Sequence, residues 1–374
     1  MSAAPATARN RGDSGDRPLD QQTYRKLISG QTSPWLGTVP LGFLRLLSGP
    51  YRLVIQSRNW LYTHDHLRVH RVGVPVVCVG NLTTGGTGKT PLVAWLARLL
   101  DEKGVRAAIL TRGYKAGKNG QSDEPAELAA ACAGVPVIVN ADRVAGAAEA
   151  IRSHDAQVIL MDDGFQHRRL ARDLDIVTID ATAPFGYGRL LPAGLLREPV
   201  GSLKRAQAVV LTRSDQVSEE QLGQIETRIR QIQPDLVIAR SVHAPVGARR
   251  SDGLQIPLEE LAGKKVFAFC GLGNPTAFFA TIQACGCVLT GSQAYNDHHV
   301  YTDHDAADLC RAARSQRIQL LLTTRKDWTK IAPLSRPEDA VPMAYLAVEL
   351  RFTAGEDALR ALIERAMAGT IPPS

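Results

Sequence analysis

The stretch that decides the fold runs from Val74 to Leu99 and reads VPVVCVGNLTTGGTGKTPLVAWLARL. It begins with an apolar, β-branched run typical of a buried strand, turns through a glycine-rich segment, and continues with leucines at helical spacing. A strand, a glycine-rich loop, a Lys-Thr pair and a helix in this order predict a phosphate-binding loop. The predicted loop residues are Thr83, Thr84, Gly85, Gly86, Thr87, Gly88, Lys89 and Thr90.

The residue types of this loop suit the binding of a nucleoside triphosphate. Glycines let backbone N–H groups approach phosphate oxygens, and the helix that follows adds unsatisfied donors at its N-terminus. We expect Lys89 to reach the β- and γ-phosphates and the Thr90 hydroxyl to ligate Mg²⁺. Thr83 departs from the motif, which has glycine at its first position, so an ordinary strand–helix turn remains the alternative. The motif alone does not say which reaction follows.

The composition is that of a globular chain of 374 residues, long enough for two domains. The six cysteines are scattered and none shows zinc-type spacing, which favours buried thiols in a reducing compartment. Cys285 and Cys287 leave a redox or metal pair as the alternative. We expect neither a secretory signal nor a membrane-spanning helix, because the first residues are polar and no long uncharged apolar run follows.

The N-terminal region carries most of the net charge of +7, since residues 1–71 hold ten basic and four acidic residues. Residues 1–34 read as a disordered tail. The segment Trp35 to Tyr62 mixes leucines, aromatic residues and arginines, and predicts two amphipathic helices separated at Gly49-Pro50. Such a segment suits the interface of a membrane, or else a helical pair packed on the catalytic core.

From Val74 to Arg240, apolar strands alternate with helical patterns, which predicts an α/β fold with a doubly wound, mainly parallel sheet. Polar side chains follow the strands. Four apolar residues precede Asp162-Asp163, a Walker B pattern whose carboxylates hold the magnesium ion of a nucleotide. Asp123-Glu124 precedes an alanine-rich run, and is either a helix start or a catalytic base at the mouth of the sheet. Arg189 and Arg197 lie in a long loop and suit phosphate or carboxylate binding.

The rest of the chain predicts a second, smaller α/β domain. We place the boundary after Arg240, so that residues 35–240 form the first domain and residues 241–374 the second. The pattern loosens between Ser241 and Leu258, which suggests a linker, and the tail helix Glu356 to Met367 can pack back on the first domain. Three histidines cluster at positions 298, 299 and 304, which is compatible with a metal site, a catalytic partner or a polar helix entrance.

Five segments together resemble the tetraacyldisaccharide 4'-kinases, the lipid A kinases of Gram-negative bacteria. They read GNLTTGGTGKTP, DDGFQH, GRLLPAGLLREP, CGLGNPTAFF and DHHVYT, and the resemblance covers about residues 35–335 in matching order. It implies ATP-dependent phosphorylation of the 4'-hydroxyl of a tetraacylated glucosamine disaccharide 1-phosphate, which gives lipid IVA. It also implies a peripheral or monotopic enzyme at the cytoplasmic face of the inner membrane, and two α/β/α domains with the catalytic one N-terminal.

The resemblance assigns roles to individual positions. Lys89 and Thr90 match the family's phosphate-loop residues, and Asp123 matches its general base. His298 matches the histidine that forms a dyad with this base. We expect Mg²⁺ to be held by Thr90, Asp162, Asp163 and Glu124. We expect the acceptor to be bound by Arg143, Gln166, His167, Arg189 and Arg197.

Two other classes of protein compete with the kinase. One is a P-loop ATPase or GTPase of the metallochaperone type, in which the histidine cluster and Cys285 with Cys287 would deliver metal. The other is a nucleic-acid protein that uses the basic N-terminus. The leucines and aromatic residues between Trp35 and Tyr62 disfavour a nucleic-acid groove, so we expect a lipid and a membrane surface as partners, and no nucleic acid.

Overall fold

The computed structural model of the chain describes residues 28, 34–113, 123–250, 252–272, 275–296, 299–334 and 341–369, with only the backbone given for residues 34–40, 123 and 124. These residues form two compact units. The larger unit contains residues 28–244 and 349–369, and the smaller unit contains residues 245–348. The units therefore meet four residues beyond the expected boundary, and the last helix belongs to the larger unit.

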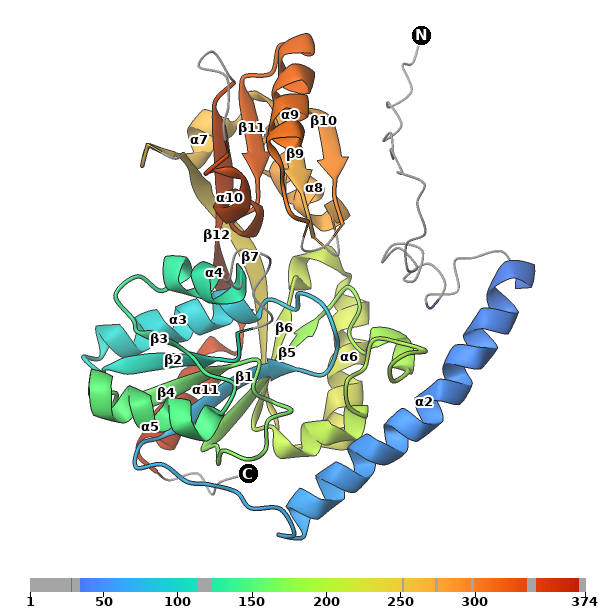
Figure 1. The fold of residues 1–374 in the computed structure, drawn as a ribbon, viewed down its shortest axis with the longest axis vertical. Helices are drawn as coiled ribbons and strands as arrows, with labels where there is room; N and C mark the ends of the chain where they lie inside the picture. Colours follow the sequence, from blue (N-terminus) through green and yellow to red (C-terminus); the bar gives the residue numbers. More distant parts are fainter. Residues whose placement is uncertain are drawn as a thin grey trace. The chain divides into compact units, whose positions relative to one another are not determined.

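The larger unit is built on a sheet with the strand order β7-β6-β5-β1-β4-β2-β3 (Figure 1). Its strands are β1 (Val76–Asn81), β2 (Ala107–Thr111), β3 (Val137–Val139), β4 (Val158–Asp162), β5 (Leu174–Asp180), β6 (Ala208–Thr212) and β7 (Val237–Arg250). All the neighbouring pairs in this order are parallel. The expected doubly wound α/β sheet is confirmed, and β1 lies between β4 and β5 with its carboxyl end at the site.

Helices cover both faces of this sheet, because successive strand residues point to opposite sides. Val77 and Val79 share a core with α3 (Lys89–Glu102), α4 (Asp123–Ala131) and α11 (Glu356–Met367). Val76 and Cys78 instead pack with α5 (Arg143–His154), and α6 (Glu219–Ile232) covers β5 and β6 on a further cluster. Short 3₁₀ turns occupy Gly186–Gly188 (η1), Val200–Arg205 (η2) and Ser214–Gln216 (η3).

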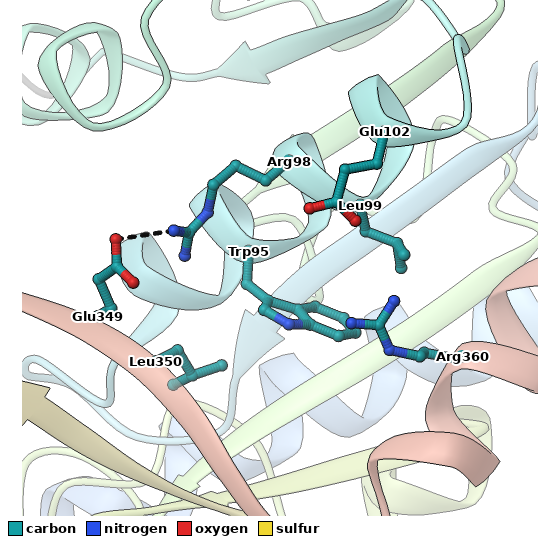
Figure 2. Close-up of a pocket in the computed structure, with 7 residues that line it drawn as sticks. All are labelled: Trp95, Arg98, Leu99, Glu102, Glu349, Leu350 and Arg360. Carbon is teal, nitrogen blue, oxygen red and sulfur yellow. Dashed lines mark hydrogen bonds and ion pairs between the residues drawn. The ribbon is translucent and has the colours of Figure 1, made fainter.

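The end of the chain packs against α3, the helix that begins at the phosphate loop. Arg98 of α3 pairs with Glu349 at 2.8 Å, and Arg360 of α11 lies over the Trp95 ring at 5.1 Å from its centroid. Figure 2 shows these side chains around a hollow of about 230 Å³, which the ion pair and the stacked arginine line. Residues far apart in the sequence thus complete one core.

The N-terminal helix α2 (Pro34–Thr63) is one continuous element of 30 residues. The predicted break at Gly49-Pro50 is wrong. A proline inside a helix costs about 3 kcal/mol, and contacts on both sides of it oppose this cost. Ser48 Oγ donates to the Leu190 carbonyl at 3.1 Å, and the Tyr51 hydroxyl donates to the Arg197 carbonyl at 2.9 Å. In the described part of the chain, no helix is both long and apolar enough to cross a membrane.

The smaller unit contains four neighbouring strands and two cores of its own. Its elements are β8 (Gln255–Ile256), α7 (Leu258–Leu261), β9 (Lys265–Cys270), α8 (Pro275–Ala284), β10 (Val288–Ala294), α9 (Asp303–Ser315), β11 (Leu320–Thr323), α10 (Arg325–Ile331) and β12 (Met343–Ala354). The strand order is β10-β9-β11-β12, with parallel pairing. The segment expected as a linker is instead the end of β7, which pairs with β8 in antiparallel fashion.

Candidate active site

The glycine-rich loop connects β1 to α3 as predicted. Gly88 caps α3 in the left-handed conformation, with φ of 84°. A Cβ atom at Gly88 would lie 3.0 Å from the Thr212 Cγ2 atom and 3.0 Å from His243 Nε2, so this position needs glycine for both backbone and space. Lys89 and Thr90 then form the first turn of α3, where helix N–H groups lack partners within the helix. The loop therefore has the conformation that an anion-binding helix N-terminus requires.

Threonine side chains from the neighbouring strands fix this loop. The Thr87 and Thr178 hydroxyls lie 2.7 Å apart and share a hydrogen bond, and Thr212 Oγ1 donates to the Thr87 carbonyl at 3.0 Å. On the other side, Thr83 bridges to Leu196, and Thr84 N–H donates to the Leu195 carbonyl at 2.8 Å. Thr83, which replaces the first glycine of the motif, is thus part of a small backbone bridge.

An acidic pair follows β4 and faces the phosphate loop. Asp162 ends the strand, in register with Val79 of β1, and only 5% of it is exposed. Asp163 has φ of 48° and lies 3.4 Å from Lys89 Nζ. Arg197 NH1 lies 2.8 Å from the same carboxylate. Burial alone would raise the pKa of Asp163, but the charges of Lys89 and Arg197 outweigh it and hold this pKa below its usual range.

The oxygen donors at this edge fit magnesium. Mg²⁺ is bound in proteins through one or two carboxylates together with substrate phosphates and water. Thr90, Asp162 and Asp163 supply a hydroxyl and carboxylates beside the phosphate loop. The described residues contain no cluster of three or more histidine, cysteine or acidic side chains that could hold a metal ion. A metal carried by the protein alone, as at Cys285 and Cys287, has no support in this part of the chain.

Three predicted residues cannot be placed by their side chains. Asp123 and Glu124 begin α4, so their backbone is helical, but their side chains lie outside the described residues. His298 also lies outside them. Their roles stay predictions.

The residues expected to bind the acceptor gather beside Asp162 and Asp163, with one exception. Arg143 is buried at the start of α5 and donates to the Asn140 carbonyl at 2.7 Å. Gln166 Nε2 donates to the Asn81 carbonyl at 2.8 Å, which ties the turn after β4 to the end of β1. The exception is Arg189, whose guanidinium makes no ion pair with any described residue. Arg197, from the same long loop, reaches Asp163.

His167 is held uncharged at this site. Burial and the neighbouring positive charges of Arg143 and Arg172 together lower the pKa of His167 to about 4. Its Nε2 atom is buried and has no hydrogen-bond partner among the described residues. A neutral imidazole among arginines can donate or accept a hydrogen bond without adding charge, which suits contact with a sugar hydroxyl or a phosphate oxygen.

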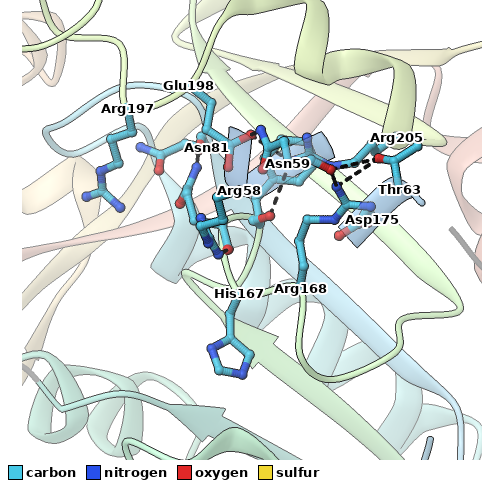
Figure 3. Close-up of polar contacts among 12 residues, drawn as sticks. Arg58, Asn59, Thr63, Asn81, His167, Arg168, Asp175, Arg197, Glu198 and Arg205 are labelled. Atoms are coloured by element: carbon cyan, nitrogen blue, oxygen red, sulfur yellow. Dashed lines mark hydrogen bonds and ion pairs between the residues drawn. The ribbon is translucent and has the colours of Figure 1, made fainter. Parts of the chain in front are cut away.

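The structure adds residues that sequence reasoning missed, and helix α2 supplies several of them. Arg58 donates to the Gln166 carbonyl, and Asn59 Nδ2 donates to Glu198 at 3.4 Å. Figure 3 shows these side chains beside Arg168, which donates to the Asn59 carbonyl at 2.8 Å. Helix α2 is therefore bonded to both loops that line the site. The repeated arginines of this segment were visible in the sequence, but their partners lie more than a hundred residues away.

A buried ion pair stabilises the turn after β4. Arg172 and Asp175 pair at 3.1 Å, and both are almost fully buried. Arg172 NH1 also donates to the His167 carbonyl at 2.8 Å. The pair thus positions the backbone of His167.

The geometry defines a class of protein. A P-loop phosphotransferase needs a phosphate loop, a lysine close to a Walker B carboxylate, and positively charged side chains next to them. The larger unit has all three. Comparison with known proteins then gives the family. The chain matches the family Tetraacyldisaccharide-1-P 4'-kinase (LpxK) over residues 41–368, and it belongs to this family.

Curated relatives and a solved structure agree with this assignment. The tetraacyldisaccharide 4'-kinase of Syntrophus aciditrophicus is 38% identical over 82% of this chain and 88% of its own length. That of Geobacter metallireducens is 37% identical over 84% of this chain and 96% of its own. The crystal structure of LpxK from Aquifex aeolicus in complex with ATP has a TM-score of 0.69 and 29% identity, and covers 88% of this chain and all of that one.

Proposed function

We propose that this chain, a tetraacyldisaccharide-1-phosphate 4'-kinase by family, uses Lys89 to neutralise the transferred phosphoryl group and Asp123 to take the proton of the acceptor hydroxyl. The enzyme transfers the γ-phosphate of ATP to the 4'-hydroxyl of an acylated glucosamine disaccharide 1-phosphate, a step of lipid A biosynthesis. The observation that carries the nucleotide chemistry is the 3.4 Å contact between Lys89 of the phosphate loop and Asp163 after β4.

Phosphoryl transfer depends mainly on positioning and on neutralising charge. Thr90, Asp162, Asp163 and Glu124 would hold Mg²⁺, which would supply positive charge to neutralise the phosphates. Lys89 at the start of α3 binds the same phosphates with its ammonium group. Because Lys89 and Arg197 both lie at Asp163, two cations flank the place where the γ-phosphate is bound.

A sugar hydroxyl is a weak nucleophile and benefits from a carboxylate that accepts its proton. Asp123 is our candidate for this base and His298 for its partner, as the family resemblance implies. The acceptor's negative charge is matched by Arg143, Arg197 and Arg189, while Gln166 and neutral His167 offer hydrogen bonds. In this proposal, lipid recognition and catalysis share the turn after β4.

The membrane is the second partner that we propose, at the cytoplasmic face of the bacterial inner membrane, whereas we expect no nucleic-acid partner. Helix α2 has two different faces. One face packs on the larger unit through Ser48, Tyr51 and Asn59. The other exposes Phe43, Leu46, Leu47, Leu53, Val54 and Trp60, between 43% and 72% of each. Arginines flank this stripe, and such a helix lies in a bilayer interface without crossing it.

Transfer of labelled γ-phosphate from ATP to a detergent-solubilised tetraacyldisaccharide 1-phosphate tests the reaction. Labelled lipid should form only with Mg²⁺ present. Release of free phosphate at one rate with or without the lipid would instead point to an NTPase that drives a partner protein.

Asp123→Ala should slow transfer about a hundredfold or more while ATP binding survives. His298→Ala should behave alike, and the double variant should lose less than the product of the two single losses.

Sedimentation with vesicles of anionic phospholipid tests the membrane proposal. A variant with Phe43, Leu46 and Leu53 changed to serine should lose vesicle binding and keep ATP binding. A matched control changes Val139, Leu254 and Val288 to serine, three apolar side chains that are about half exposed elsewhere on the chain. Equal loss of vesicle binding in both variants would contradict a specific role for α2.

A further inference from the structure

The segment between β10 and α9 has contacts within the smaller unit that the chemistry described so far does not use. Asp327, at the start of α10, is fully buried. Its Oδ2 atom accepts bonds from Gly271 N–H at 3.0 Å and from the Thr324 hydroxyl at 2.7 Å. A Cβ atom at Gly271 would lie 3.0 Å from the Asn296 carbonyl and 3.6 Å from His299 Cβ. Asp327 thus fixes the end of β9 at the place where this segment packs closely on it.

The ring of His299 is held on three sides. It stacks on Tyr295 with 4.5 Å between the ring centroids, and it meets Tyr301 edge-on at 4.9 Å. Its Nε2 atom lies 3.2 Å from Asp305 Oδ2, an oxygen that also accepts bonds from the N–H and the hydroxyl of Thr302. Burial alone would raise the pKa of Asp305, but the bonds from Thr302 and His299 hold this pKa below its usual range. Asp305 is therefore a fixed carboxylate that orients the imidazole.

The backbone of His299 is fixed as well. Its N–H donates to the Asn296 carbonyl at 3.0 Å, and its carbonyl accepts a bond from Lys330 Nζ at 3.3 Å. The sequence has only two residues between Asn296 and His299, and His298 is one of them. The described residues on both sides of His298 are therefore bonded to each other, and His299 joins them to α10.

Apolar packing alone does not account for these contacts. Val300, the residue after His299, is 77% exposed, so the segment lies at the surface of the smaller unit. A side chain that only filled space beside Tyr295 and Tyr301 would need no hydrogen-bond donor, whereas His299 directs one at Asp305. A ring that is stacked and bonded at its far end has one orientation, and it restrains the backbone to which it is attached.

We propose that His299 is a positioning residue for phosphoryl transfer, which fixes the segment that contains His298. It touches neither the nucleotide nor the acceptor and acts through His298, the candidate partner of the base. This inference deepens the proposed function and rests on it. A misplacement of about 1 Å can slow an enzymatic step a hundredfold, so a group that takes part in proton transfer needs such support before the substrate binds.

The labelled-lipid assay on the full-length protein tests this inference, with kcat and KM measured for ATP and for the lipid. His299→Ala should lower kcat about tenfold to a hundredfold and leave both KM values within about twofold, because His299 touches neither substrate. In the His298→Ala background the same change should lower kcat by less than about twofold, since no histidine is left to position. His304→Ala is the matched control and should keep the wild-type kcat, because the His304 side chain is 80% exposed on α9.

His299→Gln and His299→Leu separate positioning from the filling of space. Glutamine keeps a donor for Asp305 at about the reach of the imidazole, whereas leucine fills the space without a donor. Glutamine should therefore recover part of the kcat that alanine loses, and leucine should not. A wild-type kcat in His299→Leu would overturn the inference. This comparison also decides the matter if His299→Ala does not fold.

His298→Ala tells the two possible failures apart. If this variant transfers phosphate at a near-normal rate, the proposed dyad is wrong, and the positioning role of His299 is wrong with it. If it is slow, but His299→Ala lowers kcat equally with and without His298, the dyad stands and only the positioning role is overturned.

Discussion

Lys89 illustrates how one side chain connects the loop to the chemistry. It begins α3, and its ammonium lies 3.4 Å from Asp163. Lys89→Ala removes the cation that the transferred phosphoryl group meets, so transfer to lipid should fall by about a thousandfold or more. Lys103→Ala is a matched control, because Lys103 is an exposed lysine at the other end of α3 whose ion pair with Glu364 is at the surface. Transfer close to the wild-type rate in Lys89→Ala would refute the assignment of the loop.

His243 should make the stability of the fold depend on pH. Burial and the positive charge of Arg213 together lower the pKa of His243 to about 3. The unfolded chain binds this proton near pH 6.5, so stability from this residue is complete above pH 6.5 and is lost as the pH falls toward 3. Between pH 6.5 and pH 5 the free energy of unfolding should fall by about 2 kcal/mol on account of His243.

Urea unfolding at a series of pH values measures this effect. The variant His243→Gln should show a shallower loss of stability below pH 6.5 than the wild type, whatever its stability at neutral pH. His154→Gln, which changes an exposed histidine at the end of α5, should keep the wild-type slope. Parallel curves for wild type and His243→Gln would show that His243 takes up its proton in the folded state.

At the scale of elements, the sequence predicted what depends on local pattern. The apolar run before Gly80 and the leucines after Pro91 were sufficient to predict β1 and α3, because hydrophobic periodicity and glycine placement are local signals. The prediction failed where contacts between residues far apart in the sequence determine the structure. Pro50 reads as a break, yet α2 continues because Ser48 and Tyr51 are bonded to a loop more than a hundred residues later.

Tyr51 offers a test of this coupling between α2 and the site. Burial raises the pKa of Tyr51, and the charge of Glu198 raises it further, so the hydroxyl stays protonated and donates to the Arg197 carbonyl. Tyr51→Phe should lower the free energy of unfolding by about 1 kcal/mol and speed hydrogen exchange in residues 190–197. Gln56→Ala, at an exposed position of the same helix, is the control. Unchanged exchange in the loop would show that α2 does not restrain it.

At the scale of the whole molecule, the division of the chain was the least predictable feature. The segment from Ser241 to Leu258 contains proline and glycine and reads as a linker, but β7 continues through it to Arg250. Strands β7 and β12 each pass from one unit to the other, so no change of composition marks the boundary at Ala244 or Val348. The sequence likewise suggested Asp162, Asp163 and Arg197 as site residues, but not Arg213, whose partner Gly86 lies 127 positions away.

The larger unit contains every described contact that fixes the phosphate loop, which predicts that it can bind nucleotide by itself. Thr353 Oγ1 donates to the Arg240 carbonyl at 3.4 Å, and a Cβ atom at Gly355 would collide with the Ile238 carbonyl. The two strands therefore run in opposite directions here, which places Ala244 opposite Glu349. A short turn such as Asn-Gly should join these two residues in place of the smaller unit.

The shortened chain, residues 34–244 joined to 349–369, should bind ATP with Mg²⁺ within about threefold of the full-length affinity, because Thr178, Thr212 and Arg213 still hold the loop. Its transfer of phosphate to lipid should fall by about a hundredfold or more, because His298 is missing. Calorimetric titration with ATP and the labelled-lipid assay measure the two properties. A version that also ends at Thr353 is the control. It lacks α11 and the buried Leu359, Leu362 and Ile363 of the core beneath α3, so it should fail to fold. Loss of ATP binding in the folded shorter chain would show that the smaller unit contributes to the nucleotide site.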